Sequence, residues 1–199
     1  MPKLTKFWHS FIFMQKHLQG ILPAFLSWKS VHTCHVCTKC NSYVSPEMIA
    51  DIEDYGNINS GAVMFLKLSE ELRHKGWSDD GVDMDADAGD SMKGADAGLD
   101  PRMKSIVFKS PENDNVLLKL LPTRCLSACS EPQTIALVGN TEKFSYQFGR
   151  IEFENLKDMA TVIADYCRSK DGYSSTRTRP IGLKGRVLAR IPPINGRRK

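Results

Sequence analysis

The chain has 199 residues, a net charge of +4, 41% hydrophobic residues and 25% charged residues, an ordinary composition for one folded domain with a core. Its six cysteines are too few for a disulfide scaffold. No run approaches the ~18 consecutive apolar residues that a membrane span needs, and no Asn-x-Ser/Thr glycosylation acceptor occurs. We therefore expect an intracellular, reducing environment, in which thiols stay free.

Residues 1–30 form a basic leader without acidic residues. On a helical wheel its large apolar residues share one face: Leu4, Phe7, Phe11, Met14 and Leu18. An organellar targeting peptide has these properties, although this leader lacks Arg and has few Ser. Two interpretations stay open. A targeting leader would place the protein in a mitochondrion or plastid, whereas a disordered extension would leave it in the cytoplasm.

Residues 31–193 contain the elements of one α/β domain. Residues 30–36 are β-like, and residues 60–76 predict a helix with Ser60 as N-cap and Gly76 as stop. Residues 78–101 contain eight Asp and one Lys, a net charge of −7 that leaves +11 for the rest of the chain. With little to bury, this acidic segment is predicted to be a disordered, solvated loop.

Four strands and a helix are predicted after the acidic loop. The strands span residues 105–109, 115–121, 133–138 and 144–149, and residues 139–143 join the last two as a hairpin. A capping pair, Asn155 with Asp158, begins a helix that ends at Asp171-Gly172. Its inward residues are Met159, Val162, Ile163 and Tyr166. The basic, proline-containing tail from Ser174 is predicted to be irregular, with residues 194–199 as a short basic end.

This order of elements predicts an α/β sandwich with a small mixed sheet and flanking helices, compatible with a thioredoxin-like arrangement. Two pairs of cysteines follow strand-like stretches in it: Cys37 with Cys40, and Cys125 with Cys129. Loops that leave neighbouring strands at the same edge of a sheet come together. Four thiolates from two such loops would surround one metal centre that depends on the fold.

Sulfur-only ligation suits either a [2Fe-2S] cluster or zinc, and the spacing does not decide between them. The small residues Ser127 and Ala128 favour the cluster, because they let backbone amides approach its sulfides. Unligated thiols are a third interpretation.

Other cysteine and histidine residues receive simpler assignments. Cys34 is a possible substitute ligand, although an extra thiol within a strand explains it more simply. Cys167 follows the inward side of the second helix and is expected to be a core residue. His32 and His35 are interpreted as polar surface residues rather than ligands, although imidazole binds zinc and some iron–sulfur centres.

Three motifs together resemble one family. They are VCTKC at residues 36–40, CLSAC continuing to YQFG over residues 125–149, and RPIGLKGRVLARIPP over residues 179–193. Across residues 32–193, apart from the acidic insertion, the chain resembles the metal-binding family catalogued as domain of unknown function 1636. The resemblance implies a thioredoxin-like ferredoxin fold, a [2Fe-2S] cluster and the ligands Cys37, Cys40, Cys125 and Cys129. The leader, the acidic loop and the extra Cys34 depart from the family pattern.

We therefore expect a ferredoxin-like protein that carries one electron or senses metal or redox state. Its basic tail would dock an acidic redox partner through Arg177, Arg179, Lys184, Arg186 and Arg190. A zinc-stabilised structural or interaction domain is the first alternative. A thiol oxidoreductase, with Cys37 as nucleophile and Cys40 resolving, is the second. It needs a helix that begins directly at the C-x-x-C pair, and intervening residues separate the two.

No glycine-rich phosphate loop and no Ser/His/Asp grouping stands out in the sequence. Enzymatic activity therefore has no support, and no catalytic residue is predicted. Nucleic-acid binding has only the basic termini in its favour, without interleaved aromatic residues.

Overall fold

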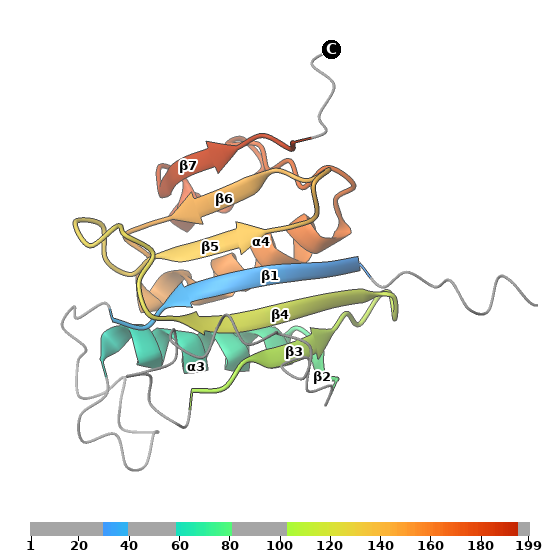
Figure 1. Cartoon of the computed structure of the whole chain (residues 1–199), viewed down its shortest axis with the longest axis horizontal. Coiled ribbons are helices and arrows are strands. Elements are labelled where there is room, and N and C mark those ends of the chain that lie inside the picture. Colours follow the sequence, from blue (N-terminus) through green and yellow to red (C-terminus); the bar gives the residue numbers. More distant parts are fainter. Residues whose placement is uncertain (1–29, 40–58, 81–102, 195–199) are drawn as a thin grey trace, which may run out of the picture.

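The computed structural model describes residues 30–39, 59–80 and 103–194. Within these residues the chain forms a seven-stranded mixed sheet and two α-helices (Figure 1), which confirms the mixed α/β prediction. The leader before Ser30, Cys40, the acidic loop after Asp80 and the basic end lie wholly or almost wholly outside the described residues. No helix in the described part of the chain is long and apolar enough to cross a membrane.

The sheet has the strand order β2-β3-β4-β1-β5-β6-β7. β1 and β4 are parallel, and every other neighbouring pair is antiparallel. The strands are β1 (Ser30–Cys37), β2 (Ser78–Asp79), β3 (Ile106–Lys109), β4 (Val116–Thr123), β5 (Ile135–Val138), β6 (Ser145–Phe148) and β7 (Val187–Ile191). The helices are α3 (Ser60–His74) and α4 (Leu156–Arg168), with 3-10 turns η4 (Phe153–Asn155) and η5 (Ile181–Leu183).

The core lies between the sheet and the two helices. On the central strand β1, alternate side chains point to this side, and His32, Cys34 and Val36 are buried there. The register places Cys34 between Leu120 of β4 and Leu137 of β5, both fully or almost fully buried. From α4 the core receives the predicted inward residues, and Cys167 joins them as predicted: Met159, Val162, Ile163, Tyr166 and Cys167.

The helix ends differ from the sequence predictions. The N-cap of α3 is Asn59, not Ser60, and its stop is Gly76 as predicted, at φ +87°. Asn155 is the N-cap of α4 as predicted, but its side chain makes no cap hydrogen bond in this helix, so the predicted capping pair with Asp158 does not form. Instead Asn155 accepts a hydrogen bond from the Glu152 backbone, so the capping box forms one turn earlier and η4 leads into α4. α4 ends at Arg168, before the predicted stop.

Two edge strands occupy segments that were predicted to be irregular. β7 lies in the basic tail and pairs with β6. β2 takes the first two residues of the acidic segment and pairs with β3, and its Asp79 forms an ion pair of 3.2 Å with Arg73 of α3. Neither strand has a strong hydrophobic alternation of its own. Both can still form, because β-strand formation depends on the neighbouring strand and on burial.

The first turn of α3 packs directly against the end of β1. A Cβ added at Gly61 would lie 2.2 Å from the carbonyl oxygen of Cys37 and 2.9 Å from the backbone of Thr38. These backbone atoms cannot move aside without disturbing β1. Glycine therefore allows the close approach that holds the start of α3 against Cys37.

A polar cluster lies inside the core where α4 ends. The amine of Lys143, 6% exposed, donates to the carbonyls of Tyr166 and Cys167 at 3.0 Å each and so places a positive charge at the helix C-terminus. It also lies 3.4 Å from Nε2 of His32. The prediction that His32 is a surface residue is wrong, since its side chain is 1% exposed. Burial, and then the charge of Lys143, lower the pKa of His32 to about 4.

This cluster predicts a loss of stability in mild acid. The unfolded chain takes up a proton on His32 near its ordinary pKa of 6.5, whereas the folded protein does so only near pH 4. The free energy of unfolding therefore decreases as pH falls from 6.5 towards 4, by at most about 3 kcal/mol from this residue. Urea unfolding across this range should show a shallower pH dependence in His32→Gln than in the wild type. His74→Gln, at an exposed position, should leave it unchanged, and equal slopes in all three proteins would contradict the assignment.

Substitution of Gly61 tests the packing of α3 on β1. Gly61→Ala should lower the free energy of unfolding by roughly 1–3 kcal/mol, because the added Cβ meets backbone. Gly182→Ala is the comparison, since its Cβ would meet the side chains of Asn155 and Asp158 and no strand backbone, and its loss should stay within the ~1 kcal/mol of the Asn155 cap. Urea denaturation midpoints compare the two. A loss in Gly182→Ala as large as that in Gly61→Ala would show that the Cys37 contact is not the cause.

Candidate functional site

The segments that carry the cysteines leave the sheet at the same end of its strands, where β1 and β4 stop, and this end is the cysteine edge. β1 ends at Cys37 and β4 ends at Thr123, and the parallel register aligns these two residues (Figure 1). The backbone N–H of Thr38 donates to the Thr123 carbonyl at 2.9 Å, which keeps the two chains together beyond the strands. The loop with Cys125 and Cys129 therefore begins beside Cys37.

Three of the four predicted ligands lie near this edge. Cys37 is 4% exposed, and its thiol donates to the Arg124 carbonyl with a sulfur–oxygen distance of 3.9 Å. Cys125 and Cys129 are exposed. The pKa of Cys129 is raised, first by a hydrogen bond with the Cys125 thiol, and also by the electrostatic influence of Cys125 and Cys37. Cys40, the fourth predicted ligand, lies outside the described residues.

The loop that carries Cys125 and Cys129 is fastened by contacts that sequence reasoning missed. Ser127 has φ +56°, and its backbone N–H points to Cys125 Sγ at 3.3 Å. Gln147 of β6 donates from Nε2 to the Leu126 carbonyl at 2.9 Å. No pattern in the sequence marks Gln147 for this role, because it occupies an ordinary outward position of a half-buried strand.

The start of α3 also lies at this edge, because its first turn packs on Cys37. In the sequence, intervening residues separate the C-x-x-C pair from the helix. In the fold, the start of α3 nevertheless lies against Cys37. The N-terminus of a helix carries a partial positive charge, which favours a thiolate over a thiol. The backbone carbonyl of Cys37 lies against this helix end, while its buried thiol donates to the Arg124 carbonyl.

The remaining cysteine and histidine candidates lie elsewhere. Cys34 is fully buried in the core, and burial, then the nearby Cys167, raise its pKa far above the ordinary value. Burial likewise raises the pKa of Cys167 to about 12. His35 forms a hydrogen bond of 3.0 Å between its Nδ1 and Thr123 Oγ1, and burial lowers its pKa. We therefore leave Cys34 and both histidines out of the candidate ligand set.

The donor set at the edge fits a thiolate-bound centre in its chemistry. All three described side chains are thiols, and Cys125 already accepts a backbone N–H, as thiolate ligands do. Among residues 30–39, 59–80 and 103–194, no three His, Cys, Asp or Glu side chains are arranged so that they could hold a metal ion. A complete shell of four sulfurs therefore needs Cys40 and a rotation of the cysteine side chains.

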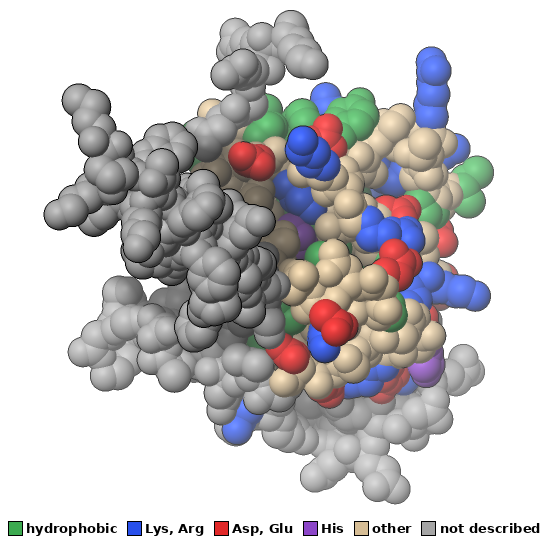
Figure 2. All heavy atoms as spheres, turned by 90° about the vertical axis from the view of Figure 1, so that its right-hand side faces the viewer, with side chains coloured by type: hydrophobic (Ala, Val, Ile, Leu, Met, Phe, Trp, Pro, Cys, Tyr) green, Lys and Arg blue, Asp and Glu red, His purple; other side chains and the backbone are tan. Residues whose placement is uncertain are grey.

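Several basic side chains predicted to dock an acidic partner have contacts within the domain. Arg179 is 7% exposed and donates to Ser174, and Arg186 forms an ion pair of 3.1 Å with Glu152. Arg190 lies over two aromatic rings. At the end of the molecule where β1 begins, Figure 2 shows basic and acidic side chains interspersed among the described residues. An acidic redox partner therefore stays a prediction.

Comparison with known proteins identifies a family for part of the chain. Residues 97–193 match the family model described as "Protein of unknown function (DUF1636)". No curated protein and no solved structure matches the chain. The matched range begins before β3, ends after β7 and includes Cys125 and Cys129, whereas β1 and Cys37 precede it. Residues 97–193 therefore match the model of the family that the motifs of the sequence predicted.

Proposed function

We propose that this protein is a ferredoxin-like metal-binding protein that carries one electron or senses metal or redox state. Cys37, Cys40, Cys125 and Cys129 would hold a [2Fe-2S] cluster. The observation that supports the proposal is that Cys37 ends β1 beside the end of β4, after which the loop with Cys125 and Cys129 begins. When bound there, the cluster would supply one-electron redox chemistry.

The two sides of the proposed site have different roles. Cys37 is buried at the end of a central strand, with its backbone N–H donating to the Thr134 carbonyl at 3.0 Å, so it provides a fixed anchor. Cys125 and Cys129 are exposed on a loop, which would give a redox partner access to the site. The Ser127 N–H is directed at Cys125 Sγ, a contact of the kind that orients a sulfur ligand towards a metal.

The proposed fold family is thioredoxin-like. In support, β1, α3 and β4 form a strand–helix–strand unit with parallel strands, and β5, β6 and α4 follow as an antiparallel hairpin and a second helix. The core residues of β1, α3 and α4 belong to one cluster, as expected when both helices cover the same face.

A thiol oxidoreductase is a second candidate, and one observation favours it. The first turn of α3 packs against Cys37, which is the surrounding that activates a nucleophilic cysteine. Its weakness is that Cys37 is 4% exposed, so a disulfide substrate reaches its sulfur only after the edge opens.

Metal and sulfide analysis tests the proposal. Full-length protein that is produced and purified without oxygen should contain iron and acid-labile sulfide in equal amounts and show visible absorption bands. Cys37→Ser, Cys125→Ala and Cys129→Ala should each lose most of this iron. Cys34→Ala and Cys167→Ala are matched controls in the same chain, and they should keep it, because both residues lie in the core.

Other outcomes of this experiment contradict the proposal. Colourless protein with one zinc per chain would indicate a zinc-stabilised structural or interaction domain. A Cys37→Ser variant that keeps all metal but loses disulfide reductase activity would indicate the thiol oxidoreductase. Iron that survives in Cys125→Ala and Cys129→Ala would show that the second loop does not bind it.

A further inference from the structure

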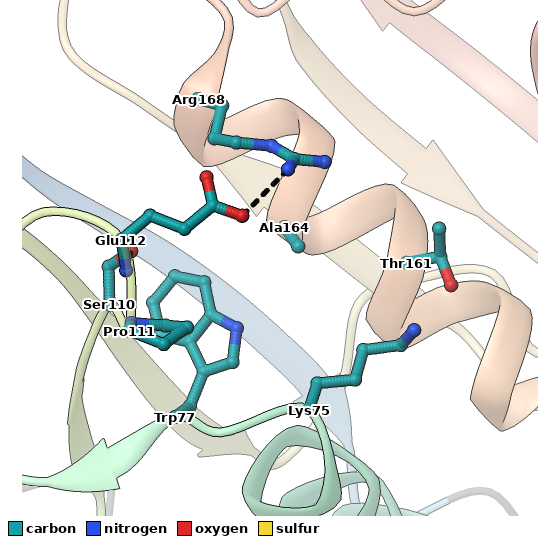
Figure 3. Close-up of a pocket in the computed structure, with 8 residues that line it drawn as sticks. All are labelled: Lys75, Trp77, Ser110, Pro111, Glu112, Thr161, Ala164 and Arg168. Atoms are coloured by element: carbon teal, nitrogen blue, oxygen red, sulfur yellow. Dashed lines mark hydrogen bonds and ion pairs between the residues drawn. The ribbon is translucent and has the colours of Figure 1, made fainter.

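A cavity of about 190 Å³ lies at the opposite end of the helices from the cysteines (Figure 3). It is bounded by the residues that follow α3, by the last turns of α4 and by the turn between β3 and β4. Trp77, Pro111 and Ala164 contribute apolar surface to its walls. Cavities of similar size accept a benzene ring, so the space suits a compact ligand with an apolar body.

The ring of a buried tryptophan places a hydrogen-bond donor at this cavity. Trp77 is 4% exposed, and Figure 3 shows its indole nitrogen on the side of the ring that faces Lys75 and α4. Within the described residues, the indole N–H has no acceptor, whereas the backbone N–H of Trp77 donates to the Leu72 carbonyl. The indole nitrogen is not among the buried polar atoms that lack a partner, so its N–H is open to the cavity and can donate to a ligand there.

A cation lies beside the same space. The half-buried Lys75 extends along the cavity wall towards α4 in Figure 3, and no carboxylate of the described residues pairs with it. Arg168 differs, because Glu112, at 2.8 Å, and Asp165 both pair with it. The Lys75 ammonium and the Trp77 indole are therefore donors of the cavity wall that no side chain of residues 30–39, 59–80 and 103–194 engages.

We propose that this cavity binds a small monocarboxylate with an apolar body. The carboxylate accepts from the Trp77 N–H and from the Lys75 ammonium, and the apolar body packs against Pro111 and Ala164. A single negative charge is expected, since Lys75 is the one cation among the described lining residues whose charge no described carboxylate offsets. The site is independent of the cysteine edge and does not rest on the function proposed above.

Titration of the full-length protein with benzoate tests this site. The ¹H–¹⁵N signal of the Trp77 indole, assigned by its loss in Trp77→Phe, should shift and saturate. Benzyl alcohol has the same ring without the charge and should bind at least about tenfold more weakly. Lys75→Gln should weaken benzoate binding about tenfold, because it removes one charge-assisted hydrogen bond. Lys67→Gln, whose lysine pairs with Glu70 on α3, is the control and should leave the affinity unchanged.

Four results would each overturn the proposal. The first is a Trp77 indole signal that does not shift with benzoate in the folded protein, and the second is benzyl alcohol binding as tight as that of benzoate, which would mean that the cavity recognises only an apolar ring. The third is a Lys75→Gln variant that binds benzoate with wild-type affinity. The fourth is saturation of the same signal by inorganic phosphate but not by benzoate, which would mean that the ligand is not a monocarboxylate.

Discussion

Parallel pairing of β1 with β4 is the constraint on which the rest of the structure depends. Its register runs from Ser30 opposite Val116 to Cys37 opposite Thr123. Parallel strands need a crossover connection, and α3 supplies it by returning over the sheet. A shift of one residue would turn the buried face of β1 outward and separate Cys37 from the loop after Thr123. The core and the candidate site therefore share one register.

The helix layer gives the molecule two chemically different ends. α3 and α4 both run away from the edge where β1 ends (Figure 1), so their N-termini and partial positive charge lie nearest the cysteines. At the other end, Lys143 neutralises the last carbonyls of α4 from inside the core, while Lys75 has no carboxylate partner in the described chain. The first end therefore combines the positive helix termini with thiols, and the second combines the negative helix termini with the cations Lys143 and Lys75.

The elements that form where the sequence predicts them are those whose own residues carry a hydrophobic pattern. The apolar spacing of α4 and the alternation of β5 and β6 are local signals, and both elements form where predicted. β7 is missed because its pairing with β6 decides its conformation. Lys143, in a predicted hairpin turn, is buried because its amine meets carbonyls from a helix much later in the chain. The meeting of the cysteine loops follows from strand order, but the contact from Gln147 depends on tertiary packing.

X-ray absorption at the metal edge of the anaerobically purified protein tests the central claim most directly, because it reports the atoms bound to the metal. The account predicts a first shell of sulfur alone, at about 2.3 Å, with a short iron–iron vector if a [2Fe-2S] cluster is present. In Cys125→Ala that shell should lose sulfur. A first shell made mainly of nitrogen and oxygen, or one that is unchanged in Cys125→Ala, would contradict the claim that Cys37 and the Cys125 loop share one metal centre.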